Sequence, residues 1–254
     1  ALVTGASSGI GAALARRLAE RKYDCVLSAR RVDRLEALAR ELEEKHGVKA
    51  YVVAADLGTR EGARTLLEKV GALGVTIDFV ANNAGFGVYG PFATQSIERV
   101  HEMIELNMVS LTTITHHFVK EMIARKKGHI LEVASIGAYQ PSPLYAVYAA
   151  TKAYVLSFSA AVNYELRDSG VSVTAVSPGL TATEFHDVAE HEKGWWMRFI
   201  TMTADDVAVI AIRNALAGRS VVTTGLMNKL MAVMVKLIPR RISTAVAELT
   251  MRSA

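Results

Sequence analysis

The stretch Thr4-Gly5-Ala6-Ser7-Ser8-Gly9-Ile10-Gly11 lies between a predicted strand that ends at Thr4 and a periodic apolar segment over residues 12–20. Its three glycines allow the backbone to turn tightly and to approach a ligand closely. The free N–H groups at the start of the next helix would face that ligand, an arrangement that binds the pyrophosphate of a dinucleotide. A purely structural turn is the alternative, and the position at the first strand-to-helix junction favours the dinucleotide site.

Short runs rich in β-branched residues recur along the 254-residue chain and alternate with helix-length segments. The predicted strands after the first are residues 26–28, 50–54, 77–81, 129–133, 171–176 and 221–223. Asp33, with Glu36 at capping-box spacing, predicts one helix start, and Gly47 predicts the end of that helix. Because parallel neighbours need crossover connections, this alternation predicts a parallel sheet between two layers of helices. We expect a single Rossmann-like, doubly wound α/β domain over residues 1–254, with a seven-stranded parallel sheet and helices on both faces.

The composition excludes several classes of protein. Hydrophobic residues make up 51% and charged residues 21% of the chain, which rules out a disordered or fibrous protein. The single cysteine, Cys25, cannot form an intrachain disulfide, and its strand-like surroundings indicate a buried, inert thiol. The net charge of +4 is spread along the chain without a basic tail, so we expect no nucleic-acid partner. The histidines show no metal-binding spacing, and we expect no metal site.

The sequence gives limited information on cellular location. No segment typical of a signal peptide is visible. Lys229 and Lys236 interrupt the most apolar late stretch well short of the roughly 20 residues that a membrane-crossing helix needs. We therefore expect a cytoplasmic protein, with attachment to a membrane surface as the open alternative.

Several short motifs together indicate a family. The spacing Gly5-x3-Gly9-x-Gly11 differs from G-x-G-x-x-G and resembles the TGxxxGxG fingerprint of the short-chain dehydrogenase/reductase family. Asn82-Asn83-Ala84-Gly85 is similar to the NNAG motif of that family, and Asp56, followed by Leu57, is similar to its adenine-side aspartate. The resemblance implies an NAD(P)-dependent oxidoreductase. The cofactor contacts that it implies in this half of the chain are Gly5, Ser7, Ser8, Gly9, Ile10, Gly11, Asp56, Leu57, Asn83, Ala84 and Gly85.

The end of the second strand indicates which cofactor is preferred. A carboxylate at this place binds the ribose diol of NAD, whereas a cation accommodates the 2′-phosphate of NADP. The chain has Ser28-Ala29-Arg30-Arg31 here, without an acidic residue. The guanidinium of Arg30 can pair with a phosphate and stack on adenine. We expect NADP(H) in preference to NAD(H), with Arg30 and Arg31 as phosphate ligands; a solvated helix start is the alternative for Arg31.

Tyr148, Lys152 and Ser135 form the predicted reactive set. The Tyr-x-x-x-Lys spacing places Tyr148 and Lys152 on one face of a helix, and Ser135 ends the fifth predicted strand. Hydride transfer to a carbonyl needs a proton donor, which Tyr148 can be, and the ammonium of Lys152 would lower the phenol pKa for the reverse reaction. Ser135 can hydrogen-bond the carbonyl oxygen. The resemblance adds Asn107, on a long helix that begins near Ser96, as the fourth catalytic residue, which holds a water in a proton relay with Lys152.

Further cofactor contacts are expected from the segment after the sixth strand. Pro178-Gly179-Leu180-Thr181-Ala182-Thr183 resembles the family's PGxxxT motif, which implies contacts from Pro178, Gly179, Thr181 and Thr183 to the nicotinamide carboxamide and the pyrophosphate. Thr183 could also serve as the N-cap of the next helix. Tyr148 and Lys152 are expected to contact the cofactor as well.

The predicted substrate site is apolar. The resemblance implies a variable lid over the substrate, here about residues 184–204, and this segment holds both tryptophans, Trp195 and Trp196. With Phe86, Tyr89, Leu144 and Tyr145 they predict a pocket for a hydrophobic ketone or aldehyde, or for its secondary alcohol. Simple packing of the two tryptophans onto the domain is the alternative.

The last segment, about residues 226–254, is predicted to be a helical extension. Over residues 226–238 the apolar side chains cover an arc of roughly 200° and leave Asn228, Lys229, Ala232 and Lys236 on the other side. Such a helix could contact a partner subunit, the substrate or an anionic membrane. The family resemblance implies a homodimer or homotetramer. A second function hypothesis is a non-catalytic dinucleotide-binding scaffold that recruits a partner or a membrane through this helix.

Overall fold

Seven parallel strands form one sheet in the computed structural model of the chain, which describes residues 1–182 and 201–252. The strand order is β3-β2-β1-β4-β5-β6-β7. The strands are β1 (Leu2–Thr4), β2 (Cys25–Ala29), β3 (Ala50–Ala54), β4 (Phe79–Asn82), β5 (Gly128–Val133), β6 (Val171–Ser177) and β7 (Val221–Thr223). All seven predicted runs are present and pair in parallel. The chain changes direction along the sheet between β1 and β4, so the carboxyl ends of these strands form the crevice where such sheets bind ligands.

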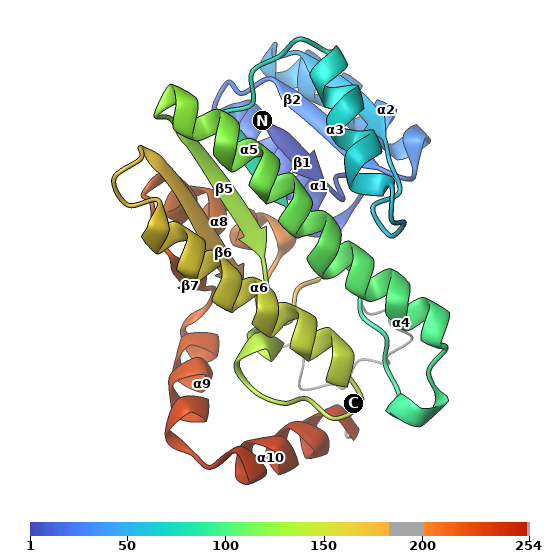
Figure 1. Cartoon of the computed structure of the whole chain (residues 1–254), viewed down its shortest axis with the longest axis vertical. Helices are drawn as coiled ribbons and strands as arrows, with labels where there is room; N and C mark the ends of the chain where they lie inside the picture. The colour runs from blue at the N-terminus through green and yellow to red at the C-terminus, as the bar shows by residue number, and fades with distance from the viewer. Residues whose placement is uncertain (183–200, 253–254) are drawn as a thin grey trace.

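Helices cover both faces of the sheet, and this confirms the predicted Rossmann-like fold (Figure 1). One face carries α1 (Gly9–Glu20), α2 (Val32–His46) and α8 (Ala204–Leu216), which share one apolar core with the strands. The other face carries α3 (Gly62–Ala72), α5 (Leu111–Arg125) and α6 (Ala146–Glu165), which pack a second core. Each crossover returns the chain to a parallel strand, so both faces are buried and the strands are mostly apolar.

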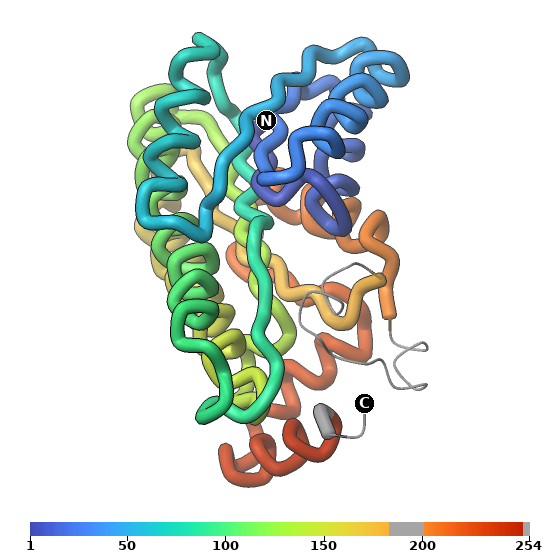
Figure 2. The backbone as a smooth tube through the Cα atoms, turned by 90° about the vertical axis from the view of Figure 1, so that its right-hand side faces the viewer, coloured from blue at the N-terminus to red at the C-terminus, as the bar shows by residue number. Residues whose placement is uncertain are grey.

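The remaining elements gather at the carboxyl ends of the strands. They are the short helices η1 (Phe92–Thr94) and η3 (Ile136–Tyr139), helix α4 (Ile97–Ile104), the π-helical turn η2 (Glu105–Ser110), α9 (Leu226–Leu237) and α10 (Arg240–Arg252). Figure 2 shows α9 and α10 at the end of the molecule that lies beyond these strand ends. No helix within residues 1–182 and 201–252 is long and apolar enough to cross a bilayer.

Two of three predicted helix boundaries are confirmed. Ser96 caps α4 by accepting a hydrogen bond from Arg99 N at 3.2 Å. Gly47 ends α2 with a left-handed backbone (φ 63°), which favours glycine. The capping box predicted at Asp33 is wrong: α2 begins at Val32 after an extended Arg31, so Asp33 lies inside the first turn, where its carboxylate faces the positive end of the helix dipole.

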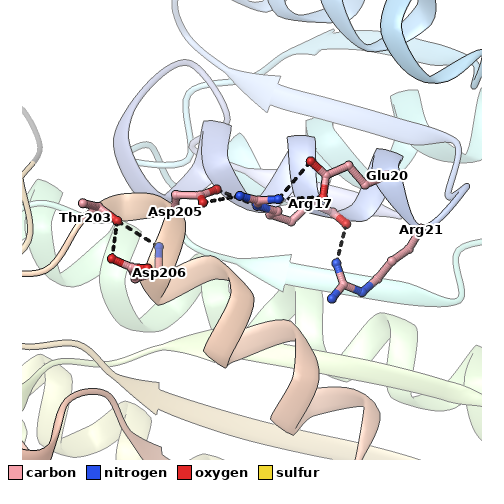
Figure 3. Close-up of polar contacts among 6 residues, drawn as sticks. All are labelled: Arg17, Glu20, Arg21, Thr203, Asp205 and Asp206. Atoms are coloured by element: carbon pink, nitrogen blue, oxygen red, sulfur yellow. Dashed lines mark hydrogen bonds and ion pairs between the residues drawn. The ribbon is translucent and has the colours of Figure 1, made fainter.

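An exposed ion pair joins α1 to α8 (Figure 3). Arg17 Nε donates to Asp205 Oδ1 at 2.6 Å, and Arg17 also binds Glu20 within its own helix at 2.8 Å. The side chains of Arg17 and Asp205 remain 30% and 50% exposed. Solvent screens such pairs, so the adhesion between the two helices rests mainly on buried side chains such as Leu14 and Ile212.

Substitutions on α1 can separate the two contributions. We expect Leu14→Ala to lower the free energy of unfolding by about 2–5 kcal/mol, because it leaves a cavity in the core. We expect Arg17→Ala to lower it by at most about 1 kcal/mol. Urea denaturation of the two variants measures both values, and an equal loss would contradict this account.

A buried polar cluster lies in the middle of the sheet. Glu132, on β5, is fully buried and accepts hydrogen bonds from Thr115 Oγ1 at 2.6 Å and from Asn82 Nδ2 at 3.2 Å. Burial raises the pKa of Glu132 to about 7, although these two bonds and the positive charge of Lys152 lower it in part. The carboxyl group is therefore half-protonated near neutral pH in the folded protein, whereas it ionises near pH 4.5 in the unfolded chain.

This difference makes stability depend on pH. Because the folded pKa is raised, the contribution of Glu132 to stability is fully present below pH 4.5 and is lost as the pH rises to about 7. The loss amounts to roughly 3 kcal/mol. Glu132→Gln does not titrate, so its free energy of unfolding should lack this decrease. Urea denaturation of both proteins between pH 4.5 and 7.5 measures the difference, and parallel curves would contradict the prediction.

Candidate active site

The glycine-rich loop connects β1 to α1 and is folded tightly against the loop after β4. Gly5 and Gly9 have left-handed backbones, with φ of 65° and 53°. A Cβ atom at Gly11 would lie 2.2 Å from Gly5 O, and one at Gly5 would lie 2.8 Å from Asn83 Nδ2. No acidic side chain occupies the first turn of α1. The loop therefore presents a close backbone and an unopposed helix N-terminus, the arrangement that an anion requires.

Thr4 and Asn83 hold this loop in place. Asn83 Nδ2 donates to Thr4 O at 3.0 Å and to Gly5 O at 3.3 Å. Thr4 Oγ1 in turn accepts from the backbone N–H groups of Asn83 and Ala84, both at 3.0 Å. The ends of β1 and β4 are thereby tied together at the point where the strand order changes direction. The predicted residues Gly5, Asn83 and Ala84 all lie at this junction.

Three separate elements bring the predicted tetrad together. Ser135 follows β5, Tyr148 and Lys152 lie on α6, and Asn107 is buried in the π-helical turn η2. Ser135 hydrogen-bonds the phenol of Tyr148, and Lys152 Nζ lies 5.9 Å from the centre of that ring.

Gly85 brings Asn107 close to Lys152. A Cβ atom at Gly85 would lie 3.0 Å from Asn107 Oδ1 and 3.2 Å from Lys152 Nζ, so this glycine occupies the space between the two side chains. Asn107 itself is fixed by Phe86, since its Nδ2 donates to Phe86 O at 3.0 Å. The tetrad residues are therefore neighbours at the carboxyl ends of β4 and β5.

Burial shifts the two titrating groups of the tetrad in opposite directions. It raises the pKa of Tyr148 to about 12, and the hydrogen bond from Ser135 opposes this only in part. It lowers the pKa of Lys152 to about 8, while the nearby carboxyl of Glu132 acts in the other direction. Lys152 Nζ also donates to Val133 O at 2.8 Å, and this bond holds the ammonium near the ring of Tyr148. Tyr148 is thus held as a neutral acid near pH 7.

The two arginines after β2 point to different partners. Arg31 Nη2 donates to Ser7 Oγ at 3.1 Å and to Ser8 Oγ at 2.8 Å, so this guanidinium lies over the glycine-rich loop. Arg30, which is exposed, lies 3.4 Å from a carboxylate oxygen of Glu102 and 3.9 Å from one of Asp56. Arg31 is half-buried and contacts these two hydroxyls at the start of α2, where a fully solvated side chain was the alternative.

The other predicted residues of the adenine half lie close by. Asp56 Oδ1 accepts from Gly58 N at 3.1 Å, which forms the turn after β3. Leu57 is buried, and its carbonyl oxygen accepts from Ser110 Oγ at 2.8 Å. Ile10 is half-buried in the first turn of α1 and packs on the first core.

The loop after β6 reaches the tetrad from the opposite side. Ile136 N donates to Pro178 O at 2.8 Å, which joins this loop to η3 beside Ser135. A Cβ atom at Gly179 would lie 2.2 Å from Asn228 Nδ2, so the first turn of α9 packs directly on the loop. Thr181 is buried. Thr183, Trp195 and Trp196 lie outside the described residues, as does most of the predicted lid.

Aromatic side chains line the approach to Tyr148. The ring centres of Tyr89 and Tyr145 are 5.2 Å apart, and those of Tyr145 and Tyr148 are 5.7 Å apart. Phe86 is buried under the guanidinium of Arg99, 3.9 Å from its ring centre. Leu144 has a left-handed backbone (φ 67°) and its carbonyl accepts from Gly90 N. This side of the site is therefore mostly aromatic.

The sequence did not single out two residues that contact the tetrad. Thr151 Oγ1 accepts from Asn107 Nδ2 at 3.1 Å and donates to Tyr148 O at 2.7 Å. Glu132 acts on the charge of Lys152 from inside the sheet. A carboxylate between two apolar residues of a central strand was the available signal for Glu132, because acids are rarely fully buried without a role.

A cavity at the opposite edge of the sheet is unrelated to this site. It measures about 570 Å³ and lies at the amino ends of the strands, lined by charged residues that include Arg21, Asp24 and Asp78. Open α/β sheets bind their ligands at the carboxyl ends, where the tetrad lies. Within residues 1–182 and 201–252, no group of histidine, cysteine, aspartate or glutamate side chains could hold a metal ion.

The features at the carboxyl ends fit a nicotinamide dinucleotide. The glycine loop leaves room for a backbone contact with a pyrophosphate at the start of α1, and Arg31 stands beside it. Farther along the crevice, Tyr148 and Lys152 are placed where a nicotinamide ring would meet a substrate. Gly5, Ser7, Gly9 and Gly11 would hold the phosphates, and Gly179 and Thr181 the carboxamide.

Solved structures with the same fold match nearly the whole chain. A 7beta-hydroxysteroid dehydrogenase superposes with a TM-score of 0.89 at 25% identity, covering 97% of this chain and 95% of that one. A short-chain dehydrogenase from Sphingobium yanoikuyae in complex with NADPH gives 0.81 at 31% identity, with 93% of each chain covered. The bulky-bulky ketone specific alcohol dehydrogenase from Comamonas testosteroni gives 0.78 at 29% identity, covering 93% and 92%.

Characterised relatives show similar identity. Very-long-chain 3-oxoacyl-CoA reductase of Anas platyrhynchos is 32% identical over 194 residues, 75% of this chain but only 62% of the reductase. 17-beta-hydroxysteroid dehydrogenase type 3 of Rattus norvegicus is 31% identical over 246 residues, 95% of this chain and 77% of that protein. Serine 3-dehydrogenase of Agrobacterium fabrum is 33% identical over 214 residues, 82% and 84%. The short chain dehydrogenase family itself matches residues 1–194, so the chain belongs to the short-chain dehydrogenase/reductase family of NAD(P)-dependent oxidoreductases.

Proposed function

We propose that the protein is an NADP(H)-dependent oxidoreductase that interconverts a hydrophobic ketone or aldehyde and its alcohol, with Tyr148 as the acid/base. The observation that carries the proposal is the cluster of Ser135, Tyr148, Lys152 and Asn107 at the carboxyl ends of β4 and β5. A site of this kind has a proton donor, a hydrogen-bond donor for the carbonyl oxygen and a cation within one small volume.

Each residue has a distinct role in the proposed reduction. When bound, NADPH would supply the hydride for the carbonyl carbon, so the residues of the site must handle the negative charge on the carbonyl oxygen. Ser135 donates a hydrogen bond to that oxygen, and Tyr148 transfers its proton to it. Lys152, held by Val133 O, stabilises the phenolate that remains. Asn107 and Thr151, which are hydrogen-bonded to each other, lie beside Lys152 and would lead a proton back from solvent through water.

The shifted pKa values suit the direction of reduction near neutral pH. A phenol with a pKa of about 12 is protonated at pH 7 and can donate. Oxidation needs the phenolate, which the charges of Lys152 and of the oxidised nicotinamide would favour. Oxidation should therefore gain more than reduction from a rise in pH.

Removal of the phenolic hydroxyl tests this mechanism. We expect Tyr148→Phe to lower kcat/KM for reduction about 10²- to 10⁴-fold, because the general acid is lost, while NADPH still binds. Tyr154→Phe is the matched control on the same helix, since Tyr154 bonds Thr112 instead of the tetrad. Consumption of NADPH with a panel of apolar ketones is the assay. Equal turnover by Tyr148→Phe would refute the mechanism, and no turnover by the wild type on any carbonyl would favour the non-catalytic scaffold.

Arg31 is our proposed main ligand for the 2′-phosphate of NADP(H). Its guanidinium bonds Ser7 and Ser8 of the glycine-rich loop, and the segment Ser28 to Arg31 contains no carboxylate that would repel a phosphate. Arg30 faces Asp56 and Glu102, whose charges partly neutralise it. A relative from Sphingobium yanoikuyae whose structure contains NADPH is consistent with this preference.

Cofactor affinities distinguish the two arginines. We expect Arg31→Ala to raise the Kd for NADPH about ten- to a hundredfold, the usual value of a lost charge-assisted hydrogen bond, and to change the Kd for NADH little. Arg30→Ala should have a smaller effect. Arg40→Ala, an exposed cation on α2, is the control. Fluorescence titration of the wild type and the three variants with each cofactor gives the affinities, and equal losses for NADPH and NADH in Arg31→Ala would argue against a phosphate contact.

The aromatic wall supports an apolar substrate. Tyr145 lies next to Tyr148, Tyr89 lies next to Tyr145, and Phe86 is bonded through its backbone to Asn107 of the tetrad, so aromatic rings gather near the reactive group. Two relatives are named for steroids and one for bulky ketones, whereas another is named for serine, so the names alone do not decide. Comparison of kcat/KM for bulky apolar ketones with that for small hydroxylated carbonyls tests the assignment. A strong preference for the small polar compounds would overturn it.

We also propose that the protein forms a homodimer or homotetramer through its long helices. The exposed apolar residues Val109 and Ile123 on η2 and α5 support a contact there. Sedimentation velocity of the full chain would establish the number of subunits.

A further inference from the structure

The buried side chains of the two C-terminal helices are small or polar. On α9 the buried residues are Asn228 and Ala232, and on α10 they are Ser243 and Ala247. Each pair is spaced four positions apart and therefore forms a single narrow strip on its helix. Asn228 bonds Thr224 O at 2.8 Å and lies against Gly179, which fixes the orientation of α9.

The opposite sides of both helices expose large apolar side chains. We name this surface the apolar face; it comprises Leu226, Met227, Leu230, Val233, Met234 and Leu237 of α9 and Ile242, Val246 and Leu249 of α10. Each of these side chains is more than half exposed, and Leu226 and Leu237 reach 85% and 79%. They are nine of the 17 exposed large hydrophobic residues in the described parts of the chain. Such a concentration marks a surface that is covered by something else.

Cations border the apolar face. At ~100° per residue, Lys229 and Lys236 lie together along one edge of the exposed apolar arc of α9. On α10, Arg241 lies ~80° from Leu249, with the exposed Ala245 between them. Long basic side chains at such edges can keep their charges at a polar boundary while their stems cover apolar surface. The helices thus have the pattern of an interfacial helix, with an apolar face and flanking lysine and arginine.

The net charge of the protein also belongs to this segment. Residues 226–252 hold five cations and one carboxylate, a net charge of +4. The whole chain carries 29 cations and 25 carboxylates, which is also +4. Cations do occur along the whole sequence, as expected, but outside this segment carboxylates balance them completely. A second copy pressed against the same surface would bring two net charges of +4 together, which like-charge repulsion disfavours.

We propose that the apolar face of α9 and α10 binds the surface of an anionic lipid bilayer. The apolar side chains would enter the boundary between head groups and acyl chains, and the flanking cations would bind the anionic head groups. Because α9 packs on Gly179, the bound protein would hold its crevice close to the lipid surface. Neither helix spans the bilayer, so attachment is peripheral and reversible. The inference does not depend on turnover.

Flotation of the full-length protein with lipid vesicles tests the proposal. The vesicles contain phosphatidylcholine alone or with about one third phosphatidylglycerol. We expect the wild type to float with the anionic vesicles and to be released by high salt, since salt screens the cations. We expect Leu230→Gln/Leu237→Gln to bind the anionic vesicles at least about tenfold more weakly than the wild type does, because two exposed apolar side chains are lost. Lys229→Gln/Lys236→Gln should lose binding to the anionic vesicles as well.

Matched controls make the result specific to this surface. Leu216→Gln/Val221→Gln removes two exposed apolar residues on α8 and β7, and Arg40→Gln/Lys45→Gln removes two exposed cations on α2. Both controls should float like the wild type. Circular dichroism and NADPH titration show whether each variant is folded.

Three results would overturn the proposal. The first is a wild type that stays with the soluble fraction on anionic vesicles. The second is equal flotation of Leu230→Gln/Leu237→Gln and the wild type. The third is a wild-type oligomer that does not float and that Leu230→Gln/Leu237→Gln dissociates in sedimentation velocity, which would assign the apolar face to a second copy of the chain.

Discussion

The contact of Asn83 with Thr4 and Gly5 is the constraint on which the rest of the site depends. Two neighbouring parallel strands end there, and their connections leave toward opposite faces of the sheet. The amide of Asn83 satisfies the carbonyl groups at the end of β1, and the hydroxyl of Thr4 satisfies the N–H groups after β4. Backbone groups that would otherwise lie open in a crevice are thereby paired within the protein. The start of α1 remains available to an external anion because this pairing does not use it.

Strand assignments and the residues at the strand ends could be predicted from the sequence because both follow from local rules. Seven β-branched runs alternate with helical segments, and parallel topology then brings the ends of those runs to one edge. Gly5, Asn83, Ser135 and Pro178 meet there as a consequence of the topology. Tyr148 and Lys152 share a helix face through their spacing alone. The proximity of Asn107 to Lys152 needed the family resemblance, because its place in a π-helical turn has no simple sequence pattern.

The directions of long side chains and the contact faces of the last helices could not be predicted. Arg30 and Arg31 are adjacent in sequence, yet Arg30 lies beside the carboxylate of Glu102, whereas Arg31 bonds Ser8 of the glycine-rich loop. These partners are distant in sequence, so the sequence does not indicate them. The sequence pattern predicts an apolar arc on α9, but periodicity does not indicate which side of the helix is buried against the domain. Here two small or polar residues meet it, since Gly179 leaves space for the amide of Asn228. The start of α2 lies one residue before Asp33, because Arg31 is extended and the helix begins at Val32.

The π-helical turn η2 between α4 and α5 changes the helical register between them. A turn of this kind holds one residue more than a regular turn, so it corresponds to a single-residue insertion into a continuous helix. The extra residue rotates the side chains of α4 by ~100° about the helix axis relative to those of α5. Asn107 in this turn is buried, while Ile114 and Phe118 on the apolar stripe of α5 remain in the core. The direction of Asn107 is thus separate from the packing of α5 on the sheet.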